Sequence, residues 1–249
     1  MVRKDLGVVL KSARSGETSK LVTFLGREAG KISLLGKGAL GPRSPFRGSL
    51  ELGNLLEVVY YYKEGRTLFF LKEASVQATL GPARDSLSHL ACAMAILELL
   101  ENVCYWRSPE AALVDLVTEF LAEPTGGDPL QTFLIVEFKV LERLGIVPDL
   151  GACTTCGQAP ADGFYYPAEG TSCCARHAHD VAHRVSLDDE LLRYASSVAR
   201  SSIAEGARVD VSRSVRKRFG QILHWTYNFH VQGYRLPNAL KLLHEKKRS

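Results

Sequence analysis

Four metal-binding side chains are spaced along this chain in two pairs, each with two residues between its members. The first pair is Cys153 and Cys156, and the second, after seventeen intervening residues, is Cys174 and His177. Such pairs are typical of a tetrahedral structural zinc site, because one tight turn can aim both donors of a pair at one ion. The stretch between the pairs is rich in Gly and Pro, which suits a small ribbon. We therefore expect one structural zinc ion held by these four residues.

Neighbouring residues leave two alternatives open. Cys173 could replace Cys174 as a ligand, although Cys174 repeats the spacing of the first pair. His179, Asp180 and His183 resemble part of a hydrolytic metal motif, so a zinc-dependent hydrolase is the alternative function. A site whose four ligands all come from the protein leaves no open position for catalysis. The cysteine pairs, together with the lack of a nucleophile motif, favour a protein that is not an enzyme.

Length and composition indicate a globular protein with one large or two modest domains. The chain has 249 residues, of which 46% are hydrophobic and 23% charged, as is ordinary for such proteins. No apolar run approaches the roughly 18–20 residues that a membrane helix needs, and the N-terminus lacks the pattern of a secretory signal. Six cysteines do not make a disulfide framework in a chain this long. We expect a cytoplasmic protein with no membrane partner, in which Cys92 and Cys104 are core thiols.

Charge is distributed unevenly along the chain. Residues 1–80 carry thirteen Lys and Arg against seven Asp and Glu, a net charge of +6. Residues 81–212 carry nine against nineteen, for −10, and residues 213–249 carry nine against one, for +8. A basic start and a basic end favour a polyanionic partner over a small-molecule substrate. The alternative is charge that serves solubility alone.

The first eighty residues have the pattern of β-strands. Five short runs rich in β-branched and aromatic residues are separated by turns that contain Gly, and Lys63–Arg66 is a hairpin signal. Five strands without a convincing helix predict an OB-type Greek-key barrel over residues 1–80, with an SH3-like barrel as the alternative. The expected strands are Leu6–Leu10, Ser19–Leu25, Lys31–Leu35, Leu56–Tyr62 and Thr67–Leu71.

From residue 81 the apolar residues follow a helical period. Asp128 and Pro129 open a strongly amphipathic helix, which Gly145 ends after Leu144. We therefore predict an α+β chain, in which a helical domain over residues 81–249 is interrupted by a zinc element at residues 150–180. The other expected helices are Asp85–Leu100, Leu113–Leu121, Asp188–Glu205, Ser212–Val231 and Leu236–Lys247, the last with Pro237 near its start.

A Gly-rich segment, Gly36–Gly41, matches the G-x-G-x-x-G pattern of dinucleotide-binding proteins. That pattern requires a helix to begin here, and Pro42 and Pro45 disfavour one. We expect instead a basic loop that contacts phosphates. The candidate DNA-binding residues are Lys4, Lys11, Arg14, Lys37, Arg43 and Arg47 in the barrel, and Arg213, Arg216 and Lys217 in the basic tail, where a solvated helix face is the alternative.

Aromatic residues near the hairpin can offer faces on which bases stack. In a strand, however, alternate residues point inward, so about half of these rings belong to the core. The residues concerned are Tyr60, Tyr61, Tyr62, Phe69 and Phe70.

Four segments of the chain match the pattern of a known family. They are Gly7–Leu10, Glu17–Leu25, Lys37–Arg43 and, most specifically, Phe138–Asp149, which runs almost directly into the first cysteine pair. On these segments the chain resembles the RecO family of bacterial recombination mediator and DNA repair proteins, over nearly its whole length. The family's second metal pair is usually Cys-x-x-Cys, whereas this chain has His177 in the last place, a replacement that zinc accepts.

The resemblance implies a fold and a function. The implied fold is an N-terminal OB barrel, a helical C-terminal domain and a zinc ribbon. The implied activities are binding of single- and double-stranded DNA and annealing of complementary strands. With the partner RecR, such a protein helps to load the RecA recombinase onto single strands coated by the single-stranded DNA-binding protein SSB. The resemblance also implies a location in the cytoplasm, at the nucleoid.

Overall fold

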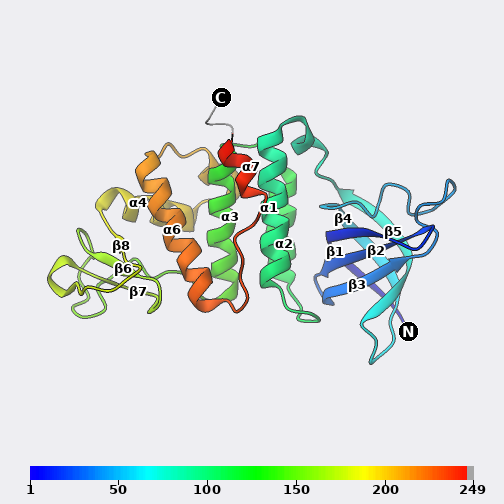
Figure 1. Ribbon diagram of the computed structural model, residues 1–249, viewed down its shortest axis with the longest axis horizontal. Coiled ribbons are helices and arrows are strands. Elements are labelled where there is room, and N and C mark those ends of the chain that lie inside the picture. Colours follow the sequence, from blue (N-terminus) through cyan, green and yellow to red (C-terminus); the bar gives the residue numbers. More distant parts are fainter. Residues whose placement is uncertain (246–249) are drawn as a thin grey trace. The chain divides into compact units, whose positions relative to one another are not determined.

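The computed structural model describes residues 1–245 (Figure 1). The chain forms two compact units, and each is described here by itself. The first unit consists of Met1–Thr125 and the described residues from Asn238 onward, and the second is Gly126–Pro237. The predicted domain limits at residue 80 and at residues 150–180 stay predictions.

Five strands open the first unit: β1 (Val2–Ser15), β2 (Ser19–Gly26), β3 (Gly30–Gly36), β4 (Leu55–Tyr61) and β5 (Leu68–Ala78). They close into a barrel in the order β1-β2-β3-β5-β4, with β1 pairing with both β2 and β4. β3 and β5 pair in parallel, and the other pairs are antiparallel. This arrangement confirms the predicted five-stranded OB-type barrel.

Two strands are much longer than predicted. β1 and β5 extend beyond Leu6–Leu10 and Thr67–Leu71 into mostly exposed residues, whose backbone groups continue the ladders with β2 and β4. Backbone pairing does not require an apolar side chain, so the hydrophobic pattern marks only the part of a strand that covers the core. The barrel core contains Tyr60 and Phe69, whose ring centroids lie 5.6 Å apart.

Three helices complete the first unit: α1 (Leu87–Val103), α2 (Ala111–Ala122) and the short α7 (Leu240–Glu245). A 3-10 turn, η1 (Gly81–Asp85), precedes α1, and of the two capping residues that the sequence offers, Asp85 and Ser86, the N-cap of this helix is Ser86. The last predicted helix begins at Leu240 rather than at residue 236, so Pro237 lies outside it. Its predicted residues 246 and 247 lie outside the described part of the chain. Cys92 and Cys104 are buried, as expected for core thiols.

The second unit is built on four helices: α3 (Pro129–Leu144), α4 (Asp189–Arg200), α5 (Ile203–Ala207) and α6 (Arg213–His230). Asp128 caps α3 by accepting a hydrogen bond from the backbone N–H of Gln131, and Gly145 ends it in a left-handed conformation, as predicted. None of the helices in the described residues is long and apolar enough to cross a membrane.

The predicted single helix Asp188–Glu205 is wrong. α4 ends at Arg200, and Ser202 starts α5 with a capping box, in which Ser202 and Glu205 each accept a hydrogen bond from the other's backbone N–H. A Ser-x-x-Glu pattern is the usual sign of such a start, so the sequence carried a signal for the break.

A small ribbon lies between α3 and α4. Its three strands, β6 (Phe164–Tyr166), β7 (Thr171–Cys173) and β8 (Val185–Ser186), form a sheet in the order β7-β6-β8. The hydroxyl groups of Tyr165 and Thr226 lie 3.0 Å apart and join the ribbon to α6. The ribbon's own buried core is small, with Cys153, Tyr166 and Cys173 at its centre.

Candidate metal centre and nucleic-acid surface

The four predicted metal ligands lie together in the ribbon. Cys153 and Cys156 belong to a tight turn closed by a 2.8 Å hydrogen bond from the N–H of Gly157 to the carbonyl of Cys153. Cys174 directly follows β7, and His177 ends the 3-10 turn η2 (Ala175–His177). The donor atoms of Cys153, Cys156, Cys174 and His177 all lie within 4.8 Å of one another.

Three of the six distances between these donor atoms match the edges of a zinc tetrahedron. The Nδ1 atom of His177 lies 3.6 Å from the Sγ of Cys153 and 3.4 Å from the Sγ of Cys174, and the Sγ atoms of Cys156 and Cys174 are 3.9 Å apart. Zinc bound at its usual lengths to sulfur and nitrogen separates two sulfurs by roughly 3.8 Å and a sulfur and a nitrogen by roughly 3.5 Å. The group is therefore suited to hold one metal ion.

Local hydrogen bonds favour the metal-binding form of Cys153. A backbone hydrogen bond from Cys174 outweighs the effect of burial and, with backbone bonds from Cys156 and Thr155 and a bond from His177, lowers the pKa of Cys153 to about 5. The thiolate is the form of cysteine that binds metal ions. The turn thus presents an anionic sulfur to the ion at neutral pH.

The structure brings Cys174, and not Cys173, into this group. Cys173 is the last residue of β7, pairs with Phe164 of β6, and lies in the ribbon core. Because successive residues of a strand point to opposite faces, only one of the two adjacent cysteines can face the other ligands. Burial raises the pKa of the Cys173 thiol, which suits a core position.

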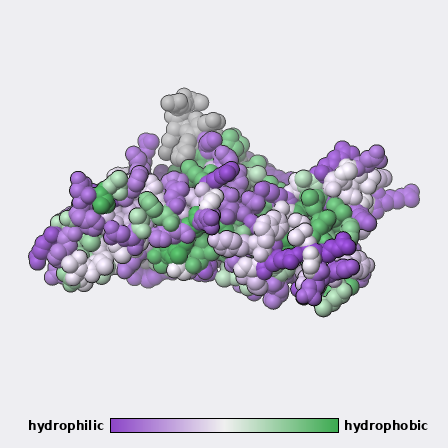
Figure 2. Space-filling model, turned by 60° about the horizontal axis from the view of Figure 1, so that its bottom comes forward, coloured by the Kyte–Doolittle hydropathy of each residue, from purple (hydrophilic) through white to green (hydrophobic). Residues whose placement is uncertain are grey.

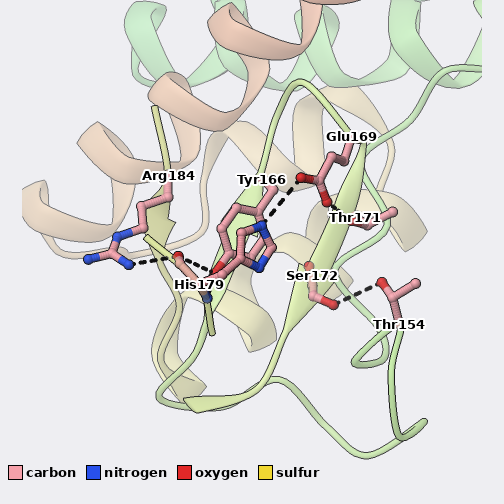
Figure 3. Close-up of polar contacts among 7 residues, drawn as sticks. All are labelled: Thr154, Tyr166, Glu169, Thr171, Ser172, His179 and Arg184. Atoms are coloured by element: carbon pink, nitrogen blue, oxygen red, sulfur yellow. Dashed lines mark hydrogen bonds and ion pairs between the residues drawn. The ribbon is translucent and has the colours of Figure 1, made fainter. Parts of the chain in front are cut away.

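The alternative hydrolytic residues have other partners. The ring of His179 stacks on that of Tyr166 with centroids 4.1 Å apart, and its Nε2 atom lies 3.4 Å from a carboxylate oxygen of Glu169 (Figure 3). Asp180 pairs with Arg184 at 3.0 Å, and the ring of His183 meets Trp225 edge-on. In the part of the chain that the structure describes, the cysteine group is the only set of three or more potential ligands that are close enough to share a metal ion.

The Gly-rich segment after β3 forms a loop of turns and no helix, which agrees with the rejection of a dinucleotide site. Lys37, Arg43 and Arg47 are exposed on this loop, and none of them forms an ion pair with another described residue. The loop borders a hollow of about 330 Å³, and Lys20 and Glu51, which pair at 2.6 Å, also line it. The loop thus presents three positive charges to solvent that no carboxylate of residues 1–245 pairs with.

The other basic candidates on the barrel interact with groups of their own unit. Lys4 pairs with Glu57 at 2.8 Å, Lys11 pairs with Glu101 at 3.0 Å, and Arg14 donates to a backbone carbonyl of the β1–β2 turn. Exposed pairs of this kind contribute about 0–1 kcal/mol. A phosphate can therefore replace the carboxylate as the partner of Lys4 or Lys11 at little cost.

The basic start of α6 divides into two kinds of residue. Arg216 pairs with Asp128 at 3.2 Å, and Arg218 pairs with Asp188 at 2.7 Å, so both link α6 to the capping residue of another helix. The side chains of these two arginines are mostly buried, and their ion pairs with Asp128 and Asp188 explain their positive charge without a DNA partner. Arg216 is thus the least available of the three candidates in the tail.

Arg213 and Lys217 are exposed, and neither forms an ion pair within residues 1–245. Cations near a helix N-terminus oppose the helix dipole at a cost of about 0.3–1 kcal/mol each. Helix stability therefore does not explain Arg213 in the first turn, whereas a phosphate partner would.

The five aromatic candidates divide as the strand period requires. Tyr60 and Phe69 are buried in the barrel, and Tyr61 and Phe70 point outward and are exposed. Tyr62 stacks on Phe69 with centroids 5.3 Å apart. Their alternation confirms that about half of the rings belong to the core.

Some surface residues were not singled out from the sequence. Val2 and Leu21 are exposed on the outside of the barrel, and Tyr105 and Trp106 are exposed after α1. Their signal was weak, because an apolar residue in a strand is normally assigned to the core. For Val2 and Leu21, only the register of the strands shows which face each one occupies.

Comparison with known proteins gives two kinds of match. Residues 1–79 match the family described as "Recombination protein O N terminal", and residues 84–239 match "Recombination protein O C terminal". A DNA repair protein RecO of Exiguobacterium sibiricum is 32% identical over 237 residues, which cover 95% of this chain and 94% of the relative. Proteins of the same name from Anaeromyxobacter sp. (strain K) and Salinibacter ruber are 32% and 30% identical, over 74% and 84% of both chains, respectively.

Proposed function

The chain belongs to the RecO family of recombinational DNA repair mediators, and we propose that it acts by binding DNA directly. It binds single- and double-stranded DNA, anneals complementary strands and helps to load a recombinase onto single strands. RecR and the SSB protein are its proposed protein partners. The proposed location is the cytoplasm, at the nucleoid, and the proposed role needs no catalytic step.

The observation that supports this proposal most directly is the basic loop after β3. Lys37, Arg43 and Arg47 lie on one loop of an OB-type barrel and have no carboxylate partner among the described residues. Unpaired cations repel one another, and a polyanion that binds between them relieves this repulsion. Phosphates of a DNA strand supply such charges at regular intervals.

The same electrostatics accounts for annealing. Two complementary strands repel each other through their phosphates, and a protein that neutralises phosphates on both strands lowers this barrier to base pairing. The loop after β3 provides a basic surface on the first unit, and the exposed cations Arg213 and Lys217 of α6 provide one on the second. Each is proposed to hold phosphates, and Lys4, Lys11, Arg14 and Arg216 are proposed as weaker contacts.

A salt titration tests the proposal. Binding of a fluorescent single-stranded oligonucleotide should weaken steeply as salt rises, and the slope of log affinity against log salt should change by about 0.7 for each phosphate contact. The triple variant Lys37→Ala/Arg43→Ala/Arg47→Ala should therefore flatten the slope by about 2. A matched variant that removes three cations of the second unit, Arg176→Ala/Arg193→Ala/Arg200→Ala, should leave the slope almost unchanged. An affinity that does not depend on salt would contradict the proposal.

An annealing assay tests the mediator role. The wild type should speed the pairing of complementary strands, both naked and coated with SSB, and the triple loop variant should lose most of this effect. Direct binding of the wild type to RecR and to SSB, measured by calorimetry, tests the proposed partners separately. If the loop variant annealed strands as well as the wild type, the loop would not be the DNA contact.

The metal that the ribbon would hold is zinc. Three thiolates and one imidazole are the donors of structural zinc sites, and a shell supplied entirely by the protein leaves no position for a substrate. Bound zinc would brace the ribbon, because such ions contribute on the order of 10 kcal/mol or more to folding and the ribbon's own core is small. Cys153, Cys156, Cys174 and His177 are the proposed ligands.

A further inference from the structure

The ribbon contains one cysteine more than its metal site uses. Cys153, Cys156 and Cys174 belong to the ligand group, whereas Cys173 lies behind that group in the ribbon core, together with Cys153. The thiol of Cys173 is within hydrogen-bonding reach of the Cys153 sulfur. Four of the six cysteines of the chain are therefore neighbours, and the ion needs only three of them.

Cys156 and Cys174 form the pair that solvent reaches. Their Sγ atoms are 3.9 Å apart, and Cys156 is exposed whereas Cys174 is half-buried. Residues 154–159 are all exposed, so the turn that carries Cys156 can shift without disturbing a core. Figure 2 shows mostly hydrophilic surface on the visible face of the ribbon, at the left of the view. A disulfide bond measures about 2.0 Å, so these two sulfurs need to approach by about 2 Å to form one.

Cys153 and Cys173 form a second pair, inside the ribbon. They are 1% and 5% exposed, respectively, so an oxidant reaches them only after the ribbon loosens. Their backbones are held close, because Cys153 forms a β-bridge with Ser172, the residue before Cys173, and the Thr154 hydroxyl donates to the Ser172 carbonyl at 3.1 Å (Figure 3). Burial therefore sets the order in which the two pairs react.

The susceptibility of a cysteine to oxidation follows its thiolate character and its exposure. A cysteine that binds zinc does so as the thiolate, which is also the form that attacks a hydroperoxide. The other two cysteines of the chain, Cys92 and Cys104, are buried in the first unit, and burial raises the pKa of Cys104 to about 12. Only Cys156 is both a metal ligand and exposed, so it is the first cysteine to react.

We propose that the ribbon is an oxidation site, at which hydroperoxides convert its four cysteines into the disulfides Cys156–Cys174 and Cys153–Cys173 and zinc is lost. The inference goes beyond the proposed DNA-binding function and rests on the proposed ligand set. Cys173 serves as the thiol that completes the second disulfide, which gives a role to a cysteine that the metal site does not use.

The first disulfide forms in two steps. The Cys156 sulfur attacks one oxygen of the hydroperoxide, so that an S–O bond forms, the O–O bond breaks, and the other oxygen leaves as hydroxide or alkoxide. The Cys174 thiolate then attacks the Cys156 sulfur, an S–S bond forms, and the oxygen on Cys156 leaves as hydroxide. The two sulfurs together lose two electrons, and the hydroperoxide gains them.

The second disulfide follows from the first. With two of the four ligands oxidised the ion is released, and the ribbon loses its main source of stability, because its own core is small. Cys153 and Cys173 then become accessible, and a second hydroperoxide oxidises them in the same way. The proton of the Cys173 thiol is taken up by the hydroxide that leaves. Two hydroperoxides are thus reduced for each zinc ion released.

The test treats the full-length, zinc-loaded protein with hydrogen peroxide. A colorimetric chelator measures released zinc, and the mass of the intact chain after alkylation gives the number of disulfides. The wild type should release one ion per chain and form two disulfides, and Cys92 and Cys104 should remain alkylated. Cys173→Ser should also release its ion but form only one disulfide. A reductant should restore every thiol, because disulfides are reversible and sulfinic acids are not.

Two further variants make the result specific. Cys104→Ala removes a buried cysteine of the first unit and should release zinc and form two disulfides as the wild type does. Cys173→Ala removes the thiol without placing a hydroxyl in the ribbon core and should form one disulfide, as Cys173→Ser does. Before oxidation, the zinc content and the circular dichroism spectrum of each variant should match those of the wild type.

The outcomes separate this inference from the ligand set on which it rests. A purified wild type without zinc would refute the ligand set and the inference with it. A zinc-loaded wild type that kept its ion in excess peroxide, or a Cys173→Ser variant that still formed two disulfides, would overturn the inference alone.

Discussion

The phenol of Tyr234 donates a hydrogen bond of 3.2 Å to a carboxyl oxygen of Glu137, inside the second unit. Glu137 lies on α3 and is almost fully buried, and Tyr227 of α6 donates to its backbone carbonyl at 2.8 Å. Burial, opposed in part by the Tyr234 hydrogen bond, raises the pKa of Glu137 to about 8. In the unfolded chain this pKa is about 4.3.

This difference predicts a pH-dependent stability. Between about pH 4.3 and pH 8 the folded state keeps a proton that the unfolded state has lost, so the contribution of Glu137 to the free energy of unfolding falls as pH rises, by about 1.4 kcal/mol per unit. Glu137→Gln keeps the shape and removes the ionisation. Urea unfolding across this range should show that the variant loses less stability than the wild type as pH rises. Parallel curves for the two proteins would show that Glu137 ionises normally.

Zinc removal should affect the ribbon first. The purified protein is expected to contain one zinc ion per chain by elemental analysis, and Cys153→Ser should lose it because a hydroxyl does not replace a thiolate ligand. Removal of zinc from the wild type with a chelator should make residues 150–187 sensitive to a protease, while the barrel stays resistant. His177→Cys is the matched control, since it supplies another zinc donor and should keep the ion. A protein that retains full metal content after Cys153→Ser would refute this ligand set.

Two glycines of the first unit should respond differently to alanine. Gly16 and Gly30 both have a φ of 65°, but a Cβ atom at Gly30 would overlap the backbone of Ser108, whereas one at Gly16 would meet nothing within 4 Å. Gly16→Ala should cost about 1–2 kcal/mol for the left-handed conformation, and Gly30→Ala about 1–3 kcal/mol more for the overlap. Chemical denaturation of both variants checks this, and equal losses would mean that the segment near Ser108 moves aside freely.

The start of α5 should depend on its capping box. Ser202→Ala removes the side chain that accepts from the N–H of Glu205 and should cost about 1 kcal/mol of stability. The double variant Ser202→Ala/Glu205→Ala should lose less stability than the sum of the losses in the two single variants, because the two residues cap the same helix end. Strict additivity in a double-mutant cycle would argue that the two hydrogen bonds act independently.

The sequence predicted the features that depend on local chemistry. The spacing of Cys153, Cys156, Cys174 and His177 predicted a group that the fold brings together, and Asp128 and Gly145 marked the two ends of α3 because caps involve only neighbouring residues. The barrel was predictable because five β-rich runs and a hairpin signal limit the topologies strongly.

Features that depend on register and on distant partners were not predictable. Nothing near Arg216 in the sequence shows that Asp128 neutralises it, and nothing near Phe70 shows that Tyr61 is its neighbour on the outer face. Such relationships arise from how strands and helices pair over long separations. The break between α4 and α5 was different, because it has a local signal in the capping pair Ser202 and Glu205. The sequence prediction missed it because the helical period of the apolar residues continues across the break.

The short helix α7 has a consequence for synthesis of the protein. It packs on α1, and the N–H of Asn238 donates to Glu98 at 2.5 Å, so a segment from the far end of the chain completes the unit that the first residues begin. On the ribosome, one side of α1 must therefore stay uncovered until α7 has been synthesised. A fragment that ends at Thr125 would lack α7, so the side of α1 that α7 covers would stay exposed, and we expect such a fragment to aggregate.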